Sequence, residues 1–156
     1  MSKFVLEVSY GQLALFDSRL AQPFNDWTDA HVRQGFSWRN GSVSFATLEA
    51  SGLIEITVGR PARSSAELAA PERSIRVPFT VPVHGELELA TLSGSIRLQL
   101  AGGEYAATFS HGRCPDGRMW AHFELEPVGT AIKAAILVAD ARLRPPAALS
   151  MNATPA

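Results

Sequence analysis

Alternation of apolar and polar residues is the feature that most limits how this chain can fold. Eight runs show it, spanning residues 4–10, 42–45, 54–58, 73–81, 86–89, 96–100, 105–110 and 119–126. Successive side chains of a β-strand point to opposite faces, so this period places the apolar residues of each run on one face. In the first run, Tyr10 is expected on the same face as Phe4 and Val8. So many short strands predict an all-β fold, an antiparallel β-sandwich or a flattened barrel.

Turn-forming residues separate these runs. Asn40-Gly41 is the strongest hairpin signal, because both residues tolerate positive φ angles, and Asp116-Gly117 is a second candidate. Pro78 lies within the run at 73–81, and proline has no N–H to donate to a neighbouring strand. We therefore expect that strand to lie at a sheet edge or to contain a bulge.

Two segments depart from the period of two. Residues 26–34 favour one short helix, with Asp26 or Thr28 as its N-cap and Gly35 just past its end. Residues 132–143 are ambiguous, because their apolar residues fit one face of a helix whereas their β-branched residues favour a strand. We favour a buried strand there.

The remaining segments define the expected domain organisation. Residues 60–73 have no clear period and predict a long exposed loop. Residues 145–156 are rich in proline and alanine and predict a mobile C-terminal tail. Since 156 residues suit one domain, we expect a single sandwich domain over residues 1–144, followed by this tail.

Charge and composition exclude several classes of protein. The 14 Lys and Arg residues nearly balance the 15 Asp and Glu residues, so direct binding of nucleic acid through a basic face is not expected. The single cysteine, Cys114, has no partner for an intramolecular disulfide. No apolar stretch reaches the ~20 residues of a membrane span. We therefore expect a cytoplasmic protein that does not bind a membrane, of undetermined oligomeric state.

No pattern typical of catalysis or of cofactor binding is visible. The four histidines are dispersed, and none is spaced from another so as to place two metal ligands on one helix face. The sequence contains no Gly-x-Ser-x-Gly motif and no glycine-rich phosphate loop. It therefore predicts a protein that is not an enzyme and that has no metal and no cofactor.

The segment from 23 to 38 is the candidate binding site. It concentrates large aromatic and acidic residues in a connection between strands. In one interpretation Trp27 and Phe36 fill one end of the sandwich while Asp26 caps the helix. In the other, the segment is a recognition loop that presents its carboxylates to a basic surface of a protein partner. The candidate partner-binding residues are Asp26, Trp27, Thr28, Asp29, Arg33 and Trp38.

Roughly the first 110 residues, including this segment, resemble a known family. The strings Val8-Ser9-Tyr10-Gly11-Gln12, Asp26-Trp27-Thr28-Asp29, Arg76-Val77-Pro78-Phe79-Thr80-Val81 and Gly102-Gly103-Glu104-Tyr105 are similar in order and spacing to the ComJ family. Its members are known as DNA-entry nuclease inhibitors associated with bacterial competence. The resemblance implies a small non-catalytic protein that binds and inhibits a DNA-degrading nuclease. The alternative is a β-sandwich module that binds a small ligand, sugar or lipid through aromatic end loops.

Overall fold

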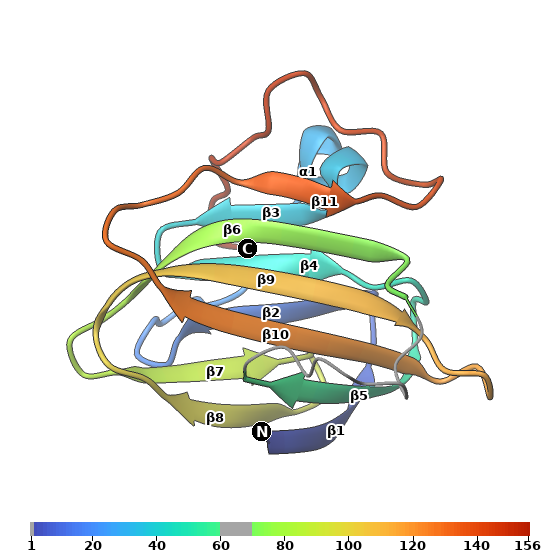
Figure 1. The fold of residues 1–156 in the computed structure, drawn as a ribbon, viewed down its shortest axis with the longest axis horizontal. Helices are drawn as coiled ribbons and strands as arrows, with labels where there is room; N and C mark the ends of the chain where they lie inside the picture. Colours follow the sequence, from blue (N-terminus) through green and yellow to red (C-terminus); the bar gives the residue numbers. More distant parts are fainter. Residues whose placement is uncertain (1, 60–69) are drawn as a thin grey trace.

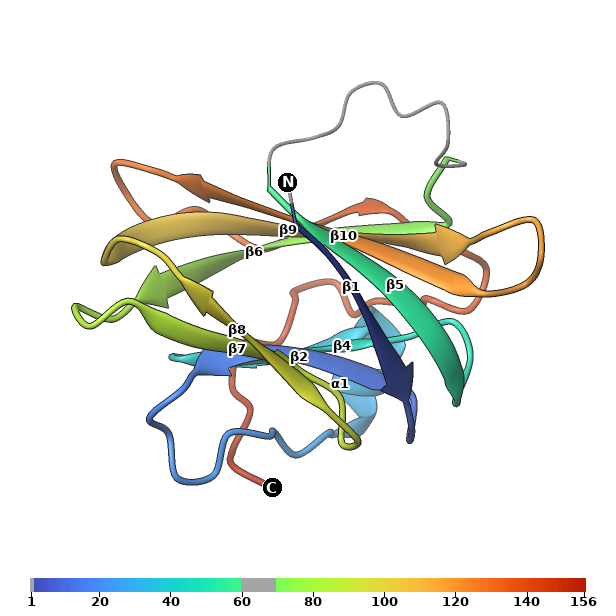
Figure 2. The same ribbon diagram turned by 90° about the horizontal axis from the view of Figure 1, so that it is seen from below.

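Two β-sheets packed face to face form the body of the protein (Figures 1 and 2). The computed structural model describes residues 2–59 and 70–156. One sheet has six strands, in the spatial order β1 (Ser2–Val8), β5 (Gly52–Val58), β10 (Met119–Pro127), β9 (Gly103–Arg113), β6 (Arg73–Val81) and β11 (Ala135–Val138). The other has five, in the order β3 (Phe36–Arg39), β4 (Ser42–Ala46), β2 (Gln12–Asp17), β7 (Glu86–Ala90) and β8 (Ser95–Gln99). Helix α1 (Asp29–Gln34) packs beside β3.

This arrangement is the all-β sandwich that the sequence predicts. Neighbouring strands pair in antiparallel fashion except β5 and β10, which run parallel. Both sheets are open, with β1 and β11 at the edges of one and β3 and β8 at the edges of the other. The flattened barrel is therefore excluded.

Aromatic side chains from both inner faces fill the space between the sheets. Phe45 of β4 stacks on Phe109 of β9, with ring centroids 4.5 Å apart and planes 15° from parallel. Phe123 of β10 lies 5.4 Å from Phe109 and 5.9 Å from Phe45, measured between ring centroids. All three are fully buried, and burying a side chain of this size contributes roughly 1.5–3 kcal/mol to folding. The apolar positions of the alternating runs thus supply the core.

Each of the eight alternating runs overlaps a strand, and both hairpin predictions are confirmed. Asn40-Gly41 connects β3 to β4, where Arg39 pairs with Ser42, and only Gly41 of the two has a positive φ, of 88°. Asp116-Gly117 lies in the turn between β9 and β10. The strand of the first run begins and ends two residues earlier than expected, because β1 spans Ser2–Val8 and leaves Tyr10 outside the sheet.

Strand β2 was not visible in the alternation. Its Leu13-Ala14-Leu15-Phe16 sequence is a continuous apolar run, and all four side chains are buried. The run is continuous because both faces of β2 are covered. Leu13 and Leu15 face the main core, whereas Ala14 and Phe16 form a second cluster with Ala90, packed against Leu20 and Phe24. The connection from β2 to α1 therefore covers the outer face of its own sheet.

Of the two expectations based on Pro78, the edge position is wrong, because strand β6 lies between β9 and β11 and not at the edge of its sheet. The pairing of β6 with β9 is continuous, and a register shift occurs only in its pairing with β11, between Ile136 and Val138. Strand β11 is short and pairs only with residues 74–76 of β6, so among the described strands Pro78 is paired on one side alone. The proline therefore lies where β6 lacks a second neighbour.

The C-terminal part of the chain follows the domain closely. The strand favoured within 132–143 exists as β11, but it is an edge strand and Leu137 and Val138 are exposed rather than buried. The segment expected to be a mobile tail runs beside the connection from β2 to α1 (Figure 2), and its Leu149 and Met151 pack against the core. Most of the loop expected at 60–73 lies outside the described residues; Arg73 begins β6.

Candidate partner-binding site

Helix α1 is short and is defined by its two caps. Thr28, and not Asp26, is the N-cap: its Oγ1 accepts a hydrogen bond from the His31 N–H, and the Thr28 N–H donates to His31 Nδ1. Gly35 ends the helix with φ 85°, and a Cβ at this position would lie 2.8 Å from a methyl group of Leu143. Positive φ and close packing both favour glycine here.

The connection that precedes α1 is anchored to the five-stranded sheet by buried groups. The Asn25 side chain is 2% exposed, and its amide donates to the carbonyls of Ser37 and Ser42 at 2.9 and 3.0 Å. Phe24 packs edge-on against Phe16, with ring centroids 5.6 Å apart. Asp26 follows this anchor directly, with its side chain exposed. The backbone next to Asp26 is therefore held by buried contacts, whereas the Asp26 carboxylate lies in solvent.

The aromatic residues of the segment 23–38 divide between the two interpretations. Phe36 is fully buried in the core. Trp38 is half-buried, and its Nε1–H donates to the Pro78 carbonyl at 2.7 Å, which links the two sheets. Trp27 is half-buried on the outside of the five-stranded sheet, where its Nε1–H donates to Gln12 Oε1 at 3.3 Å. Phe36 and Trp38 thus fill the sandwich, and Trp27 is accessible.

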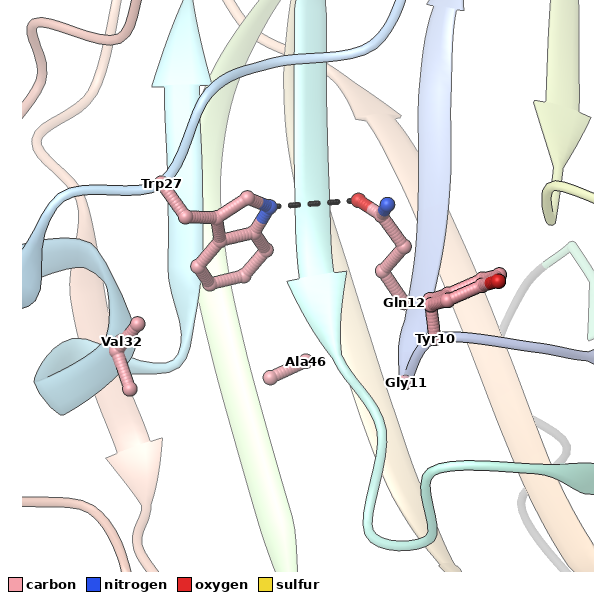
Figure 3. Close-up of a pocket in the computed structure, with 6 residues that line it drawn as sticks. All are labelled: Tyr10, Gly11, Gln12, Trp27, Val32 and Ala46. Atoms are coloured by element: carbon pink, nitrogen blue, oxygen red, sulfur yellow. Dashed lines mark hydrogen bonds between the residues drawn. The ribbon is translucent and has the colours of Figure 1, made fainter. Parts of the chain in front are cut away.

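Trp27 forms one wall of a hollow on the outer face of the five-stranded sheet (Figure 3). The hollow has a volume of about 280 Å³ and is lined by Tyr10, Gly11, Gln12, Trp27, Val32 and Ala46. Val32 of α1 is 59% exposed, and Tyr10 is 83% exposed. The hollow therefore joins residues of the β1–β2 turn, of β4 and of α1 into one largely apolar surface.

Tyr10 reaches this surface through an uncommon backbone conformation. Its φ is 58°, a value that non-glycine residues rarely adopt and that costs free energy. The turn is held by the Gly11 N–H, which donates to the Ala50 carbonyl at 2.8 Å, and by the Gly11 carbonyl, which accepts from Thr47 N–H at 2.9 Å. An exposed aromatic side chain on a strained backbone is typical of a binding position.

Two carboxylates flank Trp27 in the sequence. Asp26 and Asp29 are exposed, and the side chain of Asp29 is 96% exposed. The Arg33 guanidinium lies 3.9 Å from Asp29, a long and solvated ion pair that holds the carboxylate weakly. Among the described residues, Asp26 has no ion pair. We define the recognition surface as Tyr10, Gln12, Asp26, Trp27, Asp29 and Val32.

The structure brings together only part of the predicted site. Asp26, Trp27 and Asp29 lie on the recognition surface, Thr28 caps the helix below it, and Arg33 lies on its rim. Trp38 belongs to the core instead. Tyr10, Gln12 and Val32 were missed, because their meeting depends on contacts between distant segments. The string Ser9-Tyr10-Gly11-Gln12 was the one available signal for two of them.

Elsewhere in the described part of the chain, the titratable side chains show no arrangement typical of a metal site or of a reactive thiol. No group of three or more His, Cys, Asp or Glu side chains is placed to hold a metal within 2–59 and 70–156. His111 is fully buried; burial lowers its pKa to about 4. Burial also raises the pKa of the Cys114 thiol, and the charges of Glu55 and Asp116 add to this rise, so the reactive thiolate is disfavoured. In the same ranges, no helix is long and apolar enough to cross a membrane.

Comparison with known proteins identifies the family. The model of the family described as Competence protein J (ComJ) matches residues 5–126, which is most of the chain. The chain belongs to the ComJ family. The ComJ match includes every residue of the recognition surface and ends before β11.

Two comparisons with individual proteins extend this result. A relative from Bacillus subtilis (strain 168), described as a DNA-entry nuclease inhibitor, is 28% identical over 103 residues, which are 66% of this chain and 76% of the relative. A crystal structure of ComJ from Bacillus subtilis, described as an inhibitor of the DNA degrading activity of NucA, has a TM-score of 0.66 and 21% identity. The structural match covers 82% of this chain and 96% of the Bacillus subtilis chain. At this identity the structural likeness shows a shared ComJ fold.

Proposed function

We propose that this ComJ-family chain is a non-catalytic protein that binds a DNA-degrading nuclease and inhibits it, in the context of competence. Its family membership and the inhibitor descriptions of the two Bacillus subtilis proteins support this function. They favour it over the alternative of a small-ligand module. The location of the protein in the cytoplasm stays a prediction from the sequence.

The observation that carries the proposal is the recognition surface. Protein interfaces concentrate their binding energy in a few aromatic residues near the centre, surrounded by polar residues. Here Tyr10 and Trp27 supply accessible aromatic area, and Val32 adds an exposed apolar side chain. The hollow that these residues line has a volume of about 280 Å³, just below the range typical of small-molecule sites.

The two carboxylates give this surface its specificity for a nuclease. A nuclease cleft that holds DNA carries cationic groups, which normally bind phosphate oxygens. Asp26 and Asp29 flank Trp27 in the sequence, and among the described residues the one ion pair that either makes is the long contact of Asp29 with Arg33. We propose that these carboxylates bind the cationic groups and exclude the substrate. Two local carboxylates are enough to bind the cationic groups, so this mechanism does not require a strongly acidic protein and is compatible with a net charge of -1.

The test is a double charge reversal, Asp26→Arg with Asp29→Arg, measured as inhibition of DNA degradation by purified NucA. Both side chains are exposed, so the variant is expected to fold normally. Loss of two interface charges predicts at least about a 30-fold weaker inhibition, with reduced dependence on salt.

The matched control reverses two carboxylates on the other sheet, Glu124→Arg with Glu126→Arg, which changes the net charge equally. Both lie on β10, outside the recognition surface. The control is expected to inhibit as the unmodified protein does. Equal inhibition by both double variants would contradict the proposed role of Asp26 and Asp29, and absence of inhibition by the unmodified protein would contradict the function itself.

A further inference from the structure

The last part of the chain lies outside the ComJ match and yet contacts the segment that carries the recognition surface. The match ends at residue 126. Residues beyond β11 arch over α1 and return along the connection from β2 to α1 (Figures 1 and 2). We call residues 149–156 the C-terminal strap.

The strap binds α1 through two buried polar side chains. Gln34 is fully buried: its amide nitrogen donates to the Ser150 carbonyl at 2.9 Å, and its amide oxygen accepts from the Ser150 N–H at 2.8 Å. His31 is also fully buried; since its Nδ1 accepts from Thr28 N–H, its Nε2–H donates to Asn152 Oδ1 at 3.1 Å. Without the strap these buried groups lose partners, which costs free energy.

The strap also holds the connection that presents Asp26 and Trp27. The Asp26 N–H donates to the Thr154 carbonyl at 2.7 Å, and the Ala156 N–H donates to the Phe24 carbonyl at 3.0 Å. Asn25 and Pro155 form an antiparallel bridge between these bonds. The Ala153 N–H donates to the Trp38 carbonyl at 3.0 Å, along the outer strand β3. The strap therefore acts as a short extra strand for residues 24–26.

None of the strap residues lines the hollow at Trp27. The strap supports the recognition surface from the side of β3 and leaves the hollow open. Its contacts are with the backbone of residues 24–26 and with the inner side of α1, so they fix the position of the side chains that face the partner. This geometry excludes a role as a cover over the site.

We propose that the C-terminal strap is a positioning element that holds residues 24–32 in the conformation that binds the nuclease. The inference rests on the proposed function for its effect on inhibition, but its structural part stands separately. If residues 24–32 adopt the bound arrangement in only about 1–10% of molecules without the strap, the apparent affinity falls by about 10- to 100-fold.

The first experiment removes the strap by ending the chain after Ala148. Two readouts are needed: inhibition of NucA, and hydrogen exchange of the Asp26 amide, which donates to Thr154. We expect about a 10- to 100-fold loss of inhibition. Exchange at Asp26 should accelerate at least about tenfold, because its acceptor is gone, while the β9 and β10 amides stay protected. A synthetic peptide of residues 149–156, added in excess, is expected to restore both.

A full-length variant separates positioning from a loss of folding. Asn152→Ala removes the acceptor of His31 Nε2–H and leaves the rest of the strap in place. Loss of one hydrogen bond predicts roughly a 2- to 10-fold weaker inhibition. The matched control is Thr130→Ala, which alters an exposed side chain of the same C-terminal extension outside the strap and should change neither readout.

The outcomes distinguish this proposal from the proposed function. If the unmodified protein inhibits and the truncated protein inhibits equally well, the strap is not a positioning element. If the unmodified protein does not inhibit, the proposed function fails, and exchange at Asp26 then decides the structural part: faster exchange in the truncated protein supports positioning, and unchanged exchange overturns it. If truncation unfolds the protein, Asn152→Ala decides: inhibition and exchange equal to those of Thr130→Ala overturn the proposal.

Discussion

Tyr10 exposes its aromatic ring although its backbone conformation is unfavourable. Its φ of 58° is unfavourable for a residue with a Cβ, and its side chain is 83% exposed, so burial does not offset the strain. Such a residue is explained by function more readily than by stability. Asparagine tolerates this conformation much better than tyrosine does.

We therefore predict opposite effects of Tyr10→Asn on stability and on binding. The free energy of unfolding should rise by roughly 0.5–1 kcal/mol, because the strain is reduced. Inhibition of the partner nuclease should weaken at least about 30-fold, because an exposed aromatic side chain is lost. Urea unfolding and the DNA degradation assay measure the two effects. Val83→Ser, at a 99% exposed position away from the hollow, is the control; a Tyr10→Asn variant that inhibits normally would remove Tyr10 from the recognition surface.

Among the residues, the sequence predicted a binding role for the acidic and aromatic residues around Trp27, which stays a prediction, and did not point to Tyr10, Gln12 and Val32. Asp26 and Asp29 could be recognised because they are close together in the sequence. Tyr10 was placed on a strand by its period-two position, and only the positive φ that ends β1 turns it outward. Trp38 packs against the core, and no local pattern predicts its hydrogen bond to the Pro78 carbonyl of the opposite sheet; its assignment to the binding site stays a prediction.

Among the elements, β6 and the C-terminal segment are joined by a buried ion pair. Arg73 is 2% exposed and binds Asp140 through both of its carboxylate oxygens, with N–O distances of 2.9 and 3.0 Å. The Arg73 side chain also donates to the Ala46 carbonyl of β4 at 2.8 Å. Burial opposes ionisation of Asp140, but the hydrogen bonds and charge of Arg73 outweigh it and lower the pKa of Asp140. The pair thus fixes the chain after β11 to both sheets.

We predict that Asp140→Asn destabilises the protein by about 3 kcal/mol. The amide keeps the shape of the carboxylate but leaves the Arg73 charge buried without a counter-charge. The measurement is the free energy of unfolding in urea. Asp116→Asn, which breaks an exposed pair with Arg118, is expected to have little effect. Similar decreases in the free energy of unfolding for the two variants would show that burial of Arg73 does not increase the contribution of its ion pair to stability.

Elements were predictable from the sequence where one face is buried and one is exposed. Strands such as β6 and β10 alternate clearly and were placed almost correctly. Strand β2 was missed, because the connection to α1 covers its outer face and removes the alternation. The C-terminal strap was expected to be mobile because it is rich in proline and alanine. This composition does not reveal that a buried amide and a buried imidazole of α1 bind the strap.

For the whole molecule, His111 is the side chain that joins the two sheets through both ring nitrogens. Its Nδ1–H donates to the Trp120 carbonyl of β10 at 2.7 Å, and its Nε2 accepts from the Leu48 N–H, just after β4, at 2.9 Å. Burial is the main cause that lowers its pKa to about 4; the Trp120 carbonyl and Asp140 oppose this shift, whereas Arg73 and Arg113 contribute to it. A proton on Nε2 would point at another donor, so the neutral ring is required.

The stability of the whole domain should therefore fall on acidification. The unfolded state binds a proton at His111 near its ordinary pKa of 6.5, and the folded state only near 4, so stability is lost as the pH falls from 6.5 to 4. The full loss is about 3 kcal/mol. Burial also lowers the pKa of His122, which acts in the same direction. The free energy of unfolding, measured in urea across this pH range, should depend less steeply on pH in His111→Gln than in the unmodified protein. The glutamine amide still offers a donor and an acceptor to the two sheets. His122→Gln corrects for the second histidine. An unchanged slope in His111→Gln would mean that the link between the sheets does not depend on the neutral imidazole.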